Sequence, residues 1–334
     1  MKKLNIRNSM KIMCVLLVLG LCACQAQKTE GQRYAWPLGT SSPEDTVTHL
    51  YALKFVTEVA RLSDGKMLID IYPNGTIGGD RELLETCEEG DIPFVVQNTA
   101  PQVSFMPEMA VFDLPCVFDN IEAAREAVDN QEFYQEIQKV YDKRGYRLLG
   151  IADQGFRVMT SNTLVLQVPD FKGQKIRTME NANHLAFWQV LGANPTPMAF
   201  SEVYIGLQQK TIDAQENPYE VIASAKLYEQ QKYVIQTNHL PHYICLFMNA
   251  EFYQNLSGEQ QQIIDEAAAN ALVYAREQAD IRVTDRIKVM EDSDTEIIDL
   301  PDEVRAEMRE LSKGLYDKIR AAVGDSLADA YIGK

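Results

Sequence analysis

Residues 192–204 read GANPTPMAFSEVY, residues 206–208 read GLQ, and residues 212–218 read IDAQENP. This stretch closes a longer segment, residues 155–218, in which Arg157 and Arg177 each lie inside a short apolar β run. An arginine inside a strand is costly unless its guanidinium is paired, and its planar fork suits a carboxylate. Either arginine alone could form an internal ion pair. Two on neighbouring strand ends indicate an anionic ligand.

Outward from this segment, short β runs alternate with amphipathic helices along the chain. We expect strands at residues 34–38, 67–72, 93–97, 147–151, 156–160 and 175–178, and helices at 49–62, 80–89, 121–144 (one or two helices), 258–290 and 301–330. Gly90 is a favoured left-handed helix stop, and Ser257 with Gln260 forms a capping-box pattern. This alternation predicts an α/β fold with ligand-binding loops at the strand ends.

The composition narrows the class of protein. The chain has 334 residues, with 32 Lys+Arg against 48 Asp+Glu, a net charge of −16 and a pI near 4.8. Such a charge argues against a nucleic-acid partner, because phosphates require clustered basic residues. With 46% hydrophobic residues, the bulk is typical of a globular protein, and the length permits two domains.

The N-terminus has the pattern of a secretory signal. Residues 1–23 hold four basic residues and an apolar run, 12–21, that is too short to span a bilayer comfortably. Residues 21–24, LCAC, resemble a bacterial lipobox, so we expect lipidation of Cys24 and a polar tether, residues 24–32. A plain signal peptide cut nearby is the alternative. Cleavage would leave a chain of charge −20 in the periplasm or on the outer face of the cytoplasmic membrane.

Apart from Cys24, the proposed lipid attachment site, three cysteines follow the signal: Cys87, Cys116 and Cys245. An odd number without CxxC spacing favours small buried hydrophobes over a zinc site, although one pair could still bridge.

No familiar catalytic motif is present: the sequence lacks GxSxG, a P-loop, GxGxxG and HExxH. His239 and His242 form an HxxH pair, but Pro241 breaks the helix that would align them for a metal. We therefore expect no enzyme activity, no cofactor and no metal.

The motifs together closely resemble those of a known family. Besides residues 192–218, the resemblance includes residues 71–75 (IYPNG), 78–82 (GGDRE), 113–118 (DLPCVF), 228–233 (YEQQKY) and 237–239 (TNH). These segments resemble the solute-binding proteins of TRAP transporters, the dicarboxylate-type DctP family, which includes sialic-acid-binding members. The resemblance covers nearly all of the mature chain.

The resemblance implies a two-domain, periplasmic-binding-protein-like (type II) fold with a ligand cleft and a long connecting helix. We expect residues 33–154 and 243–282 in domain I, and residues 155–242 and 283–334 in domain II. Such a protein closes around an organic acid and delivers it to membrane permease subunits. We expect a monomer. The alternatives are an extracytoplasmic enzyme acting on carboxylates and the ligand-sensing subunit of a receptor kinase.

The family's site residues match positions in this chain. By resemblance, Arg177 is the main carboxylate clamp, Arg157 a second arginine, Asn217 the asparagine that completes the acid site, and Phe200 an aromatic beside the ligand. His184 either lines the cleft or packs.

Domain I departs from the sialic-acid-binding members. Asp80 is kept, but Pro37, Asn98 and Pro101 replace polar residues. We expect a uronate or aldonate instead, with C4-dicarboxylates left open.

In this reading Asp80, Asn98 and Gln154 contact ligand hydroxyls and Trp36 offers a stacking face. The alternatives are a helix cap for Asp80, a turn for Asn98 and core packing for Trp36.

Overall fold

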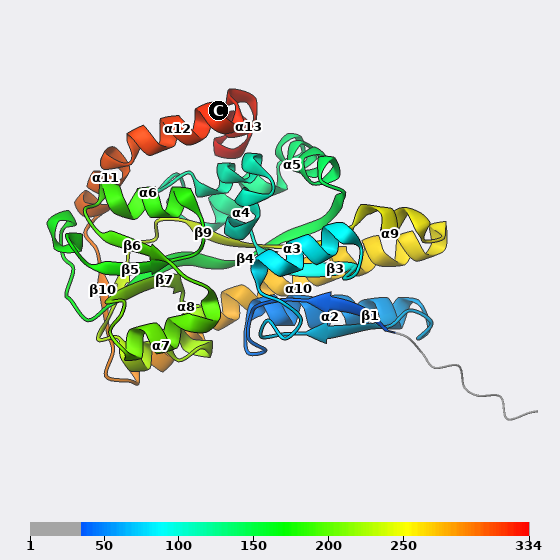
Figure 1. Cartoon of the computed structure of the whole chain (residues 1–334), viewed down its shortest axis with the longest axis horizontal. Coiled ribbons are helices and arrows are strands. Elements are labelled where there is room, and N and C mark those ends of the chain that lie inside the picture. Colours follow the sequence, from blue (N-terminus) through cyan, green and yellow to red (C-terminus); the bar gives the residue numbers. More distant parts are fainter. Residues whose placement is uncertain (1–34, 334) are drawn as a thin grey trace, which may run out of the picture. The chain divides into compact units, whose positions relative to one another are not determined.

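Strand β4, Tyr146–Ser161, runs through both halves of the sheet that organises the chain (Figure 1). The computed structural model describes residues 35–333. As far as Phe156, β4 pairs antiparallel with β9 (Pro241–Asn249). From Arg157 it pairs antiparallel with β7 (Ala214–Pro218) and, at its end, with β8 (Tyr233–Gln236).

Two half-sheets extend from β4. The first half-sheet has the order β2 (Ile69–Tyr72), β1 (Trp36–Gly39), β3 (Phe94–Asn98), β9, with β1 parallel to both neighbours and β3 antiparallel to β9. The second half-sheet holds β7, then β5 (Lys175–Thr178) and β6 (Asn194–Pro197), all parallel, with β8 and a parallel β10 (Glu296–Asp299) on its other side.

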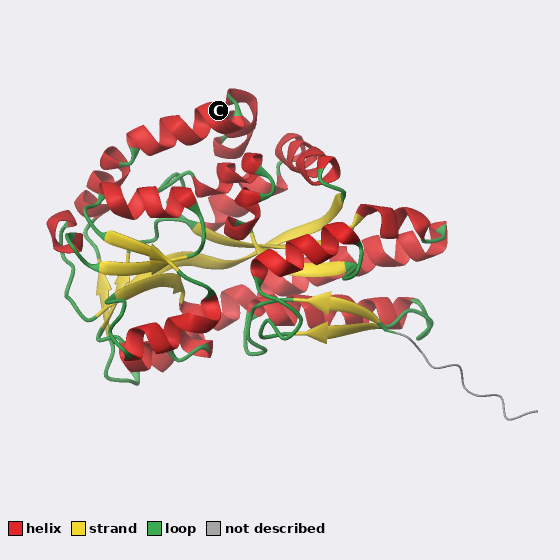
Figure 2. Cartoon of the chain, viewed as in Figure 1, coloured by secondary structure: helices red, strands yellow, loops and turns green. Residues whose placement is uncertain are grey.

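Helices cover these strands (Figure 2). They are α2 (Val47–Leu62), α3 (Asp80–Glu89), α4 (Ile121–Asp129), α5 (Gln131–Lys143), α6 (Ala182–Val190), α7 (Val203–Gln208), α8 (Tyr219–Ser224), α9 (Ala250–Asn255), α10 (Gly258–Glu291), α11 (Asp302–Leu311), α12 (Lys313–Val323) and α13 (Asp325–Ile332). Short 3₁₀ turns are η1 (Ala100–Ser104), η2 (Pro107–Asp113), η3 (Val168–Phe171), η4 (Phe200–Glu202) and η5 (Leu227–Gln230).

Helix α10 is the long connecting helix, with 34 residues. It contacts α2 and β4, and further along it contacts α8 and β10, so it follows both half-sheets. Its buried positions are largely alanines, among them Ala268, Ala271 and Ala275. Small side chains let the helix lie close to α2 and β4. Ser257 and Gln260 form the predicted capping box at its start.

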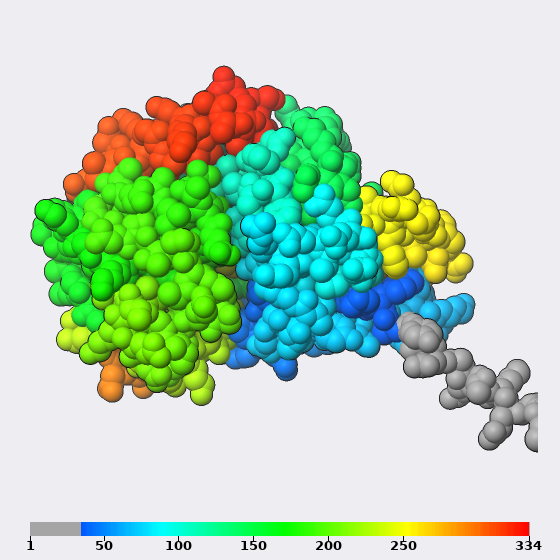
Figure 3. Space-filling view, viewed as in Figure 1, coloured from blue at the N-terminus to red at the C-terminus, as the bar shows by residue number. Residues whose placement is uncertain are grey.

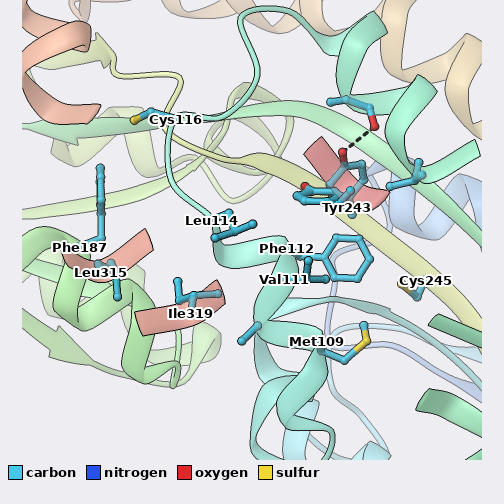
Figure 4. Packing of buried hydrophobic residues seen from close by; sticks show 14 of the residues in the cluster. Met109, Val111, Phe112, Leu114, Cys116, Phe187, Tyr243, Cys245, Leu315 and Ile319 are labelled. Atoms are coloured by element: carbon cyan, nitrogen blue, oxygen red, sulfur yellow. Dashed lines mark hydrogen bonds between the residues drawn. The ribbon is translucent and has the colours of Figure 1, made fainter. Parts of the chain in front are cut away.

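The main hydrophobic core crosses from one half to the other. It joins Val95 of β3 and Tyr243 of β9 to Ile176 of β5 and Phe187 of α6, and the C-terminal helices cover it through residues such as Ile319. Figure 4 shows Phe112 and Tyr243 next to each other on one side of this packing, and Leu315 and Ile319 near Phe187 on the other side. A second cluster lies between α2, α10 and the first half-sheet, and a third lies around α7 and α8.

The predicted α/β fold with a long helix is confirmed, as are helix 80–89 and strand 175–178. The two β runs expected at 147–151 and 156–160 are instead one strand, so that prediction was wrong. Gly155 has φ +78°, and a pairing irregularity between Asp153 and Phe156 carries the strand through the glycine. The C-terminal run, predicted as a single helix, is α11, α12 and α13, interrupted at Ser312 and Gly324.

Residues from Trp36 onward form one compact unit. The two-domain division stays a prediction, and its boundary at residues 154/155 falls inside β4, where the strand passes from one half-sheet to the other. Residues 1–23 and Cys24, predicted as signal and lipid attachment site, lie outside the described residues.

Candidate functional site

Two adjoining cavities are lined by residues from both half-sheets and their connections. Residues 41–104 accompany the first half-sheet and are called the first half below, and residues 177–221 accompany the second half-sheet and are called the second half. The larger, the outer groove, has a volume of about 620 Å³, and the smaller, the inner chamber, about 40 Å³. Figure 3 shows one face on which the green residues of the second half meet the blue and cyan residues of the first. The two cavities share Ser41, Pro43, Asp80, Arg177, Met179 and Phe200. The chamber adds Ser42, Asn98, Asn217, Val221 and His242.

Arg177 lies at the shared wall. It is the third residue of β5 and is 2% exposed. Its Nε and Nη2 donate to the carbonyl oxygen of Met198 at 2.9 and 2.6 Å. Its Nη1 is buried and has no hydrogen-bond partner among the described residues. Burial lowers the pKa of Arg177 to about 10, although Glu216 and Asp80 oppose this shift. An arginine so placed remains charged at neutral pH and lacks an acceptor for Nη1.

Arg157 lies behind the chamber and is not among the lining residues. Its Nε and Nη2 pair with the Glu216 carboxylate, Nη2 also donates to the Glu216 carbonyl at 2.6 Å, and Nη1 contacts Nδ1 of His242. Both charges of the pair are buried. The structure therefore shows the internal ion pair that the sequence left open for Arg157. All three guanidinium nitrogens of Arg157 already have partners within the protein.

Glu216 is the centre of a buried polar cluster. Besides Arg157, it accepts from Nε2 of His239 at 3.1 Å and lies 3.8 Å from Nδ1 of His184. Burial opposes ionisation, but Arg157 and the two histidines hold the pKa of Glu216 well below its usual range. His184 also bonds to the Asp113 carboxylate through Nε2 at 3.1 Å.

Burial disfavours the charged form of His184, yet these carboxylate contacts raise its pKa to about 9. His184 packs in this cluster and lines neither cavity.

Two asparagines line the chamber with amides that already have partners. Asn217 accepts from Arg157 at 3.2 Å and donates to Gln215 at 2.6 Å. Asn98, at the end of β3, accepts from the backbone of Ala100 at 2.9 Å and donates to the Tyr243 carbonyl at 2.9 Å. Asn98 thus acts as a turn residue and also forms part of the chamber wall.

Asp80 faces Arg177 across the two cavities. It is the first residue of α3, where an anion is favoured by the helix N-terminus, and Gly79 takes the cap position. Its Oδ1 accepts from the Ser41 hydroxyl at 2.5 Å and from Gln97 at 3.2 Å. Burial raises the pKa of this carboxyl above its usual range, although the hydrogen bonds from Ser41 and Gln97 and the charge of Arg177 each lower it. Phe200, at the start of η4, lines both cavities.

Two other predicted site residues lie elsewhere. Trp36 begins β1 and packs edge-on against Phe252, with Phe94 beside it, so the core-packing alternative holds. The cavities lie beyond the opposite end of β1, at Ser41, where open α/β sheets bind ligands. Gln154 is buried and donates to the Thr48 hydroxyl. Neither residue lines the groove or the chamber.

Sequence reasoning missed several lining residues. Ser41 had a usable signal, because it follows the first strand in a turn. His242 was considered only as half of a metal pair. The described residues hold no group of three or more His, Cys, Asp or Glu side chains placed to bind a metal. Met198 contributes through its carbonyl, which no side-chain pattern indicates.

Cys87, Cys116 and Cys245 are buried and free. Burial raises the pKa of Cys116 and Cys245 to about 12, and that of Cys87 further, so these thiols behave as small hydrophobes. In the part of the chain described, no helix combines the length and apolar character needed to cross a bilayer.

Known proteins resemble this chain in sequence and in fold. Residues 38–322 match the sequence profile described as bacterial extracellular solute-binding protein, family 7 (DctP). The ectoine/5-hydroxyectoine-binding periplasmic protein UehA of Ruegeria pomeroyi is 31% identical over 308 residues, covering 90% of this chain and 89% of its own.

Two solved structures are also similar. The sugar acid binding protein DctPAm from Advenella mimigardefordensis, in complex with galactonate, has a TM-score of 0.86 at 28% identity, covering 90% of this chain and 97% of that one. A TRAP periplasmic solute binding protein from Shewanella oneidensis with bound succinate has a TM-score of 0.86 at 25% identity, covering 90% and 98%. With a matched profile over most of its length and these neighbours, the chain belongs to the DctP family of TRAP solute-binding proteins.

Proposed function

We propose that this protein binds a small acid with one carboxylate and several hydroxyls, and that Arg177 holds the carboxylate. The observation that carries the proposal is the buried Nη1 of Arg177, which lacks an acceptor among residues 35–333. A buried unpaired donor of a charged group is unfavourable, and a carboxylate oxygen would satisfy it. The chamber has room for one small group such as a carboxylate.

The outer groove favours hydroxyls over a second carboxylate. Asp80, Glu82 and Glu180 line it, against Arg81 and Arg177. Arg81 already pairs with Glu85 at 3.0 Å. A second carboxylate in the groove would meet like charges, whereas ligand hydroxyls would donate to them. This charge distribution supports a uronate or aldonate over a C4-dicarboxylate, in line with the galactonate of one structural neighbour.

The size of the groove supports the same class. A volume of about 620 Å³ lies within the range of small-molecule sites, so it accommodates the remainder of a sugar acid. Ser41 and Asp80 from the first half and Arg177 and Phe200 from the second half line both cavities. We propose that the halves are the predicted domains, residues 33–154 with 243–282 and residues 155–242 with 283–334, and that they close around the ligand.

The description of the family as extracellular solute-binding proteins supports a location outside the cytoplasm. We propose that the protein is exported, that it is anchored through lipid on Cys24, and that it delivers its ligand as a monomer to TRAP permease subunits. The alternatives, an enzyme or a sensing subunit, both begin with the same binding step.

The test is a ligand screen by thermal unfolding and calorimetry. The probes are D-galactonate, D-galacturonate, D-erythronate, succinate, and the neutral sugar D-galactose as the control. We expect a sugar acid to raise the melting temperature, because a ligand at 100 times its Kd stabilises by roughly 2.7 kcal/mol. A shift with galactose and none with any acid would contradict the proposal.

Two further measurements separate the roles. Arg177→Ala should lower affinity at least about tenfold, or about 1.4 kcal/mol. NMR of the ligand after incubation with the protein should show it unchanged, whereas consumption of the ligand would favour the enzyme alternative.

A further inference from the structure

His242 is the one histidine among the residues that line the groove or the chamber, within residues 35–333. It is the second residue of β9 and is 5% exposed. Nδ2 of Asn98 lies 3.2 Å from Nδ1 and 3.4 Å from Nε2, whereas Nη1 of Arg157 contacts Nδ1 alone, and this contact determines which nitrogen carries the proton.

Nδ1 of His242 contacts Nη1 of Arg157. A guanidinium has hydrogen-bond donors and no acceptor, so Nδ1 must accept and cannot carry a proton. Burial and the Arg157 charge together hold the pKa of His242 well below its usual range, so the ring is neutral. The single proton of a neutral imidazole then lies on Nε2.

Nε2–H finds no acceptor in the described part of the chain. The polar atom recorded near it is Nδ2 of Asn98, at 3.4 Å. The orientation of that amide is fixed, because its oxygen accepts from the Ala100 backbone and its nitrogen donates to the Tyr243 carbonyl, both at 2.9 Å. Nδ2 is therefore a donor, and two donors do not form a hydrogen bond.

We propose that the Nε2–H of His242 donates a hydrogen bond to an oxygen at the carboxylate end of the bound ligand, beside Arg177. This inference rests on the proposed function and adds a residue to it. In the same chamber, the amide nitrogens of Asn98 and Asn217 each already donate a hydrogen bond within the protein, whereas Nη1 of Arg177 and Nε2 of His242 have no acceptor among residues 35–333. Arg177 supplies the charge, and His242 supplies a neutral, directional donor whose tautomer is set by Arg157.

A matched pair of substitutions separates the two ends of the ring. His242→Asn places an amide oxygen near the position of Nδ1, so it keeps an acceptor for Arg157 but loses the distal donor. His242→Gln reaches the position of Nε2 and keeps a donor there. Calorimetry uses whichever of D-galactonate, D-galacturonate, D-erythronate and succinate binds the wild-type protein.

We expect His242→Asn to weaken binding at least about tenfold, as for a lost hydrogen bond to a charged group, and His242→Gln to weaken it less. Equal affinity of wild type and His242→Asn would overturn the inference while leaving the proposed function intact. Loss of binding in Arg177→Ala together with that result would show that the arginine acts alone. If none of the four acids binds the wild type, the proposed function fails, and the inference fails with it.

A second measurement does not depend on a folded variant. In protein labelled with ¹⁵N-histidine, the nitrogen shifts of His242 should report a neutral ring with the proton on Nε2, and the bound acid should move the Nε2 signal. A proton on Nδ1, a charged ring, or an Nε2 signal that saturating acid leaves unchanged would each contradict the proposal.

Discussion

Arg177 is tied to Met198 by two hydrogen bonds, from Nε at 2.9 Å and from Nη2 at 2.6 Å, to one carbonyl oxygen. One edge of the guanidinium is therefore fixed by the protein. The other end, at Nη1, is buried and has no hydrogen-bond partner among the described residues. The carbonyl therefore orients the arginine, and in the binding mode that we propose a carboxylate approaches it at Nη1.

Replacing Arg177 by methionine should separate binding from stability. The substitution removes a buried charge that is only partly paired, so we expect the free energy of unfolding of the ligand-free protein to fall by no more than about 1 kcal/mol. Ligand affinity should fall at least about tenfold. Arg81→Met is the control, because Arg81 lines the same groove but its side chain is 66% exposed. A large loss of stability in Arg177→Met would show that the arginine is structural.

Glu216 should be far more important for stability than an exposed glutamate. Glu216→Gln leaves Arg157 as a buried charge without its counterion, and we expect a loss of roughly 3–5 kcal/mol in urea unfolding. Glu85→Gln breaks the exposed pair with Arg81 and should cost no more than about 0.5 kcal/mol. Similar losses from the two substitutions would contradict this view of the cluster.

Stability should also depend on pH through His184. Folding raises its pKa from 6.5 to about 9, so its stabilisation is complete below pH 6.5 and is lost as the pH rises through 9. The decrease should be on the order of 3 kcal/mol across this range. Urea unfolding at a series of pH values measures it, with His184→Gln as the comparison. If the free energy of unfolding of His184→Gln decreases with pH as steeply as that of the wild type, another group is responsible.

Gly150 marks a close approach between β4 and α2. A Cβ at this position would lie 2.5 Å from the hydroxyl oxygen of Tyr51, whose side chain is fully buried. Gly150→Ala should therefore destabilise the protein by about 1–3 kcal/mol in urea unfolding. Gly314 in α12 has open space around it, so Gly314→Ala should be neutral or stabilising by up to about 1 kcal/mol. Tolerance of both substitutions would mean that β4 and α2 adjust.

Local signals predicted the elements whose ends are set by local chemistry. Helix α3 ends at Gly90, with φ 88°, and α10 begins at the Ser257 capping box. The continuity of β4 could not be predicted in the same way. Gly155 resembles a break in the sequence, but long-range pairing with β9 and β7 carries the strand through it.

In the candidate site, too, some residues could be identified from the sequence, whereas the contacts of others depend on distant parts of the chain. Asp80, Asn98, Arg177, Phe200 and Asn217 come together as lining residues of the inner chamber. Arg157 carries the same charge as Arg177, and only the position of Glu216 decides that its fork is filled internally. Trp36 is correctly placed on β1 but at the wrong end of it, which residue type alone does not reveal. The donor role proposed for His242 depends on a contact with Arg157 from another strand.

The sharing of β4 between the half-sheets has a consequence for cooperativity. Neither half-sheet is complete without this strand, and one hydrophobic core contains residues of both halves. A fragment covering either half would expose part of that core and lose the strand that joins its sheet. Residues 36–333 should therefore melt in a single transition, with equal calorimetric and van't Hoff enthalpies, and limited proteolysis should yield no stable half-molecule.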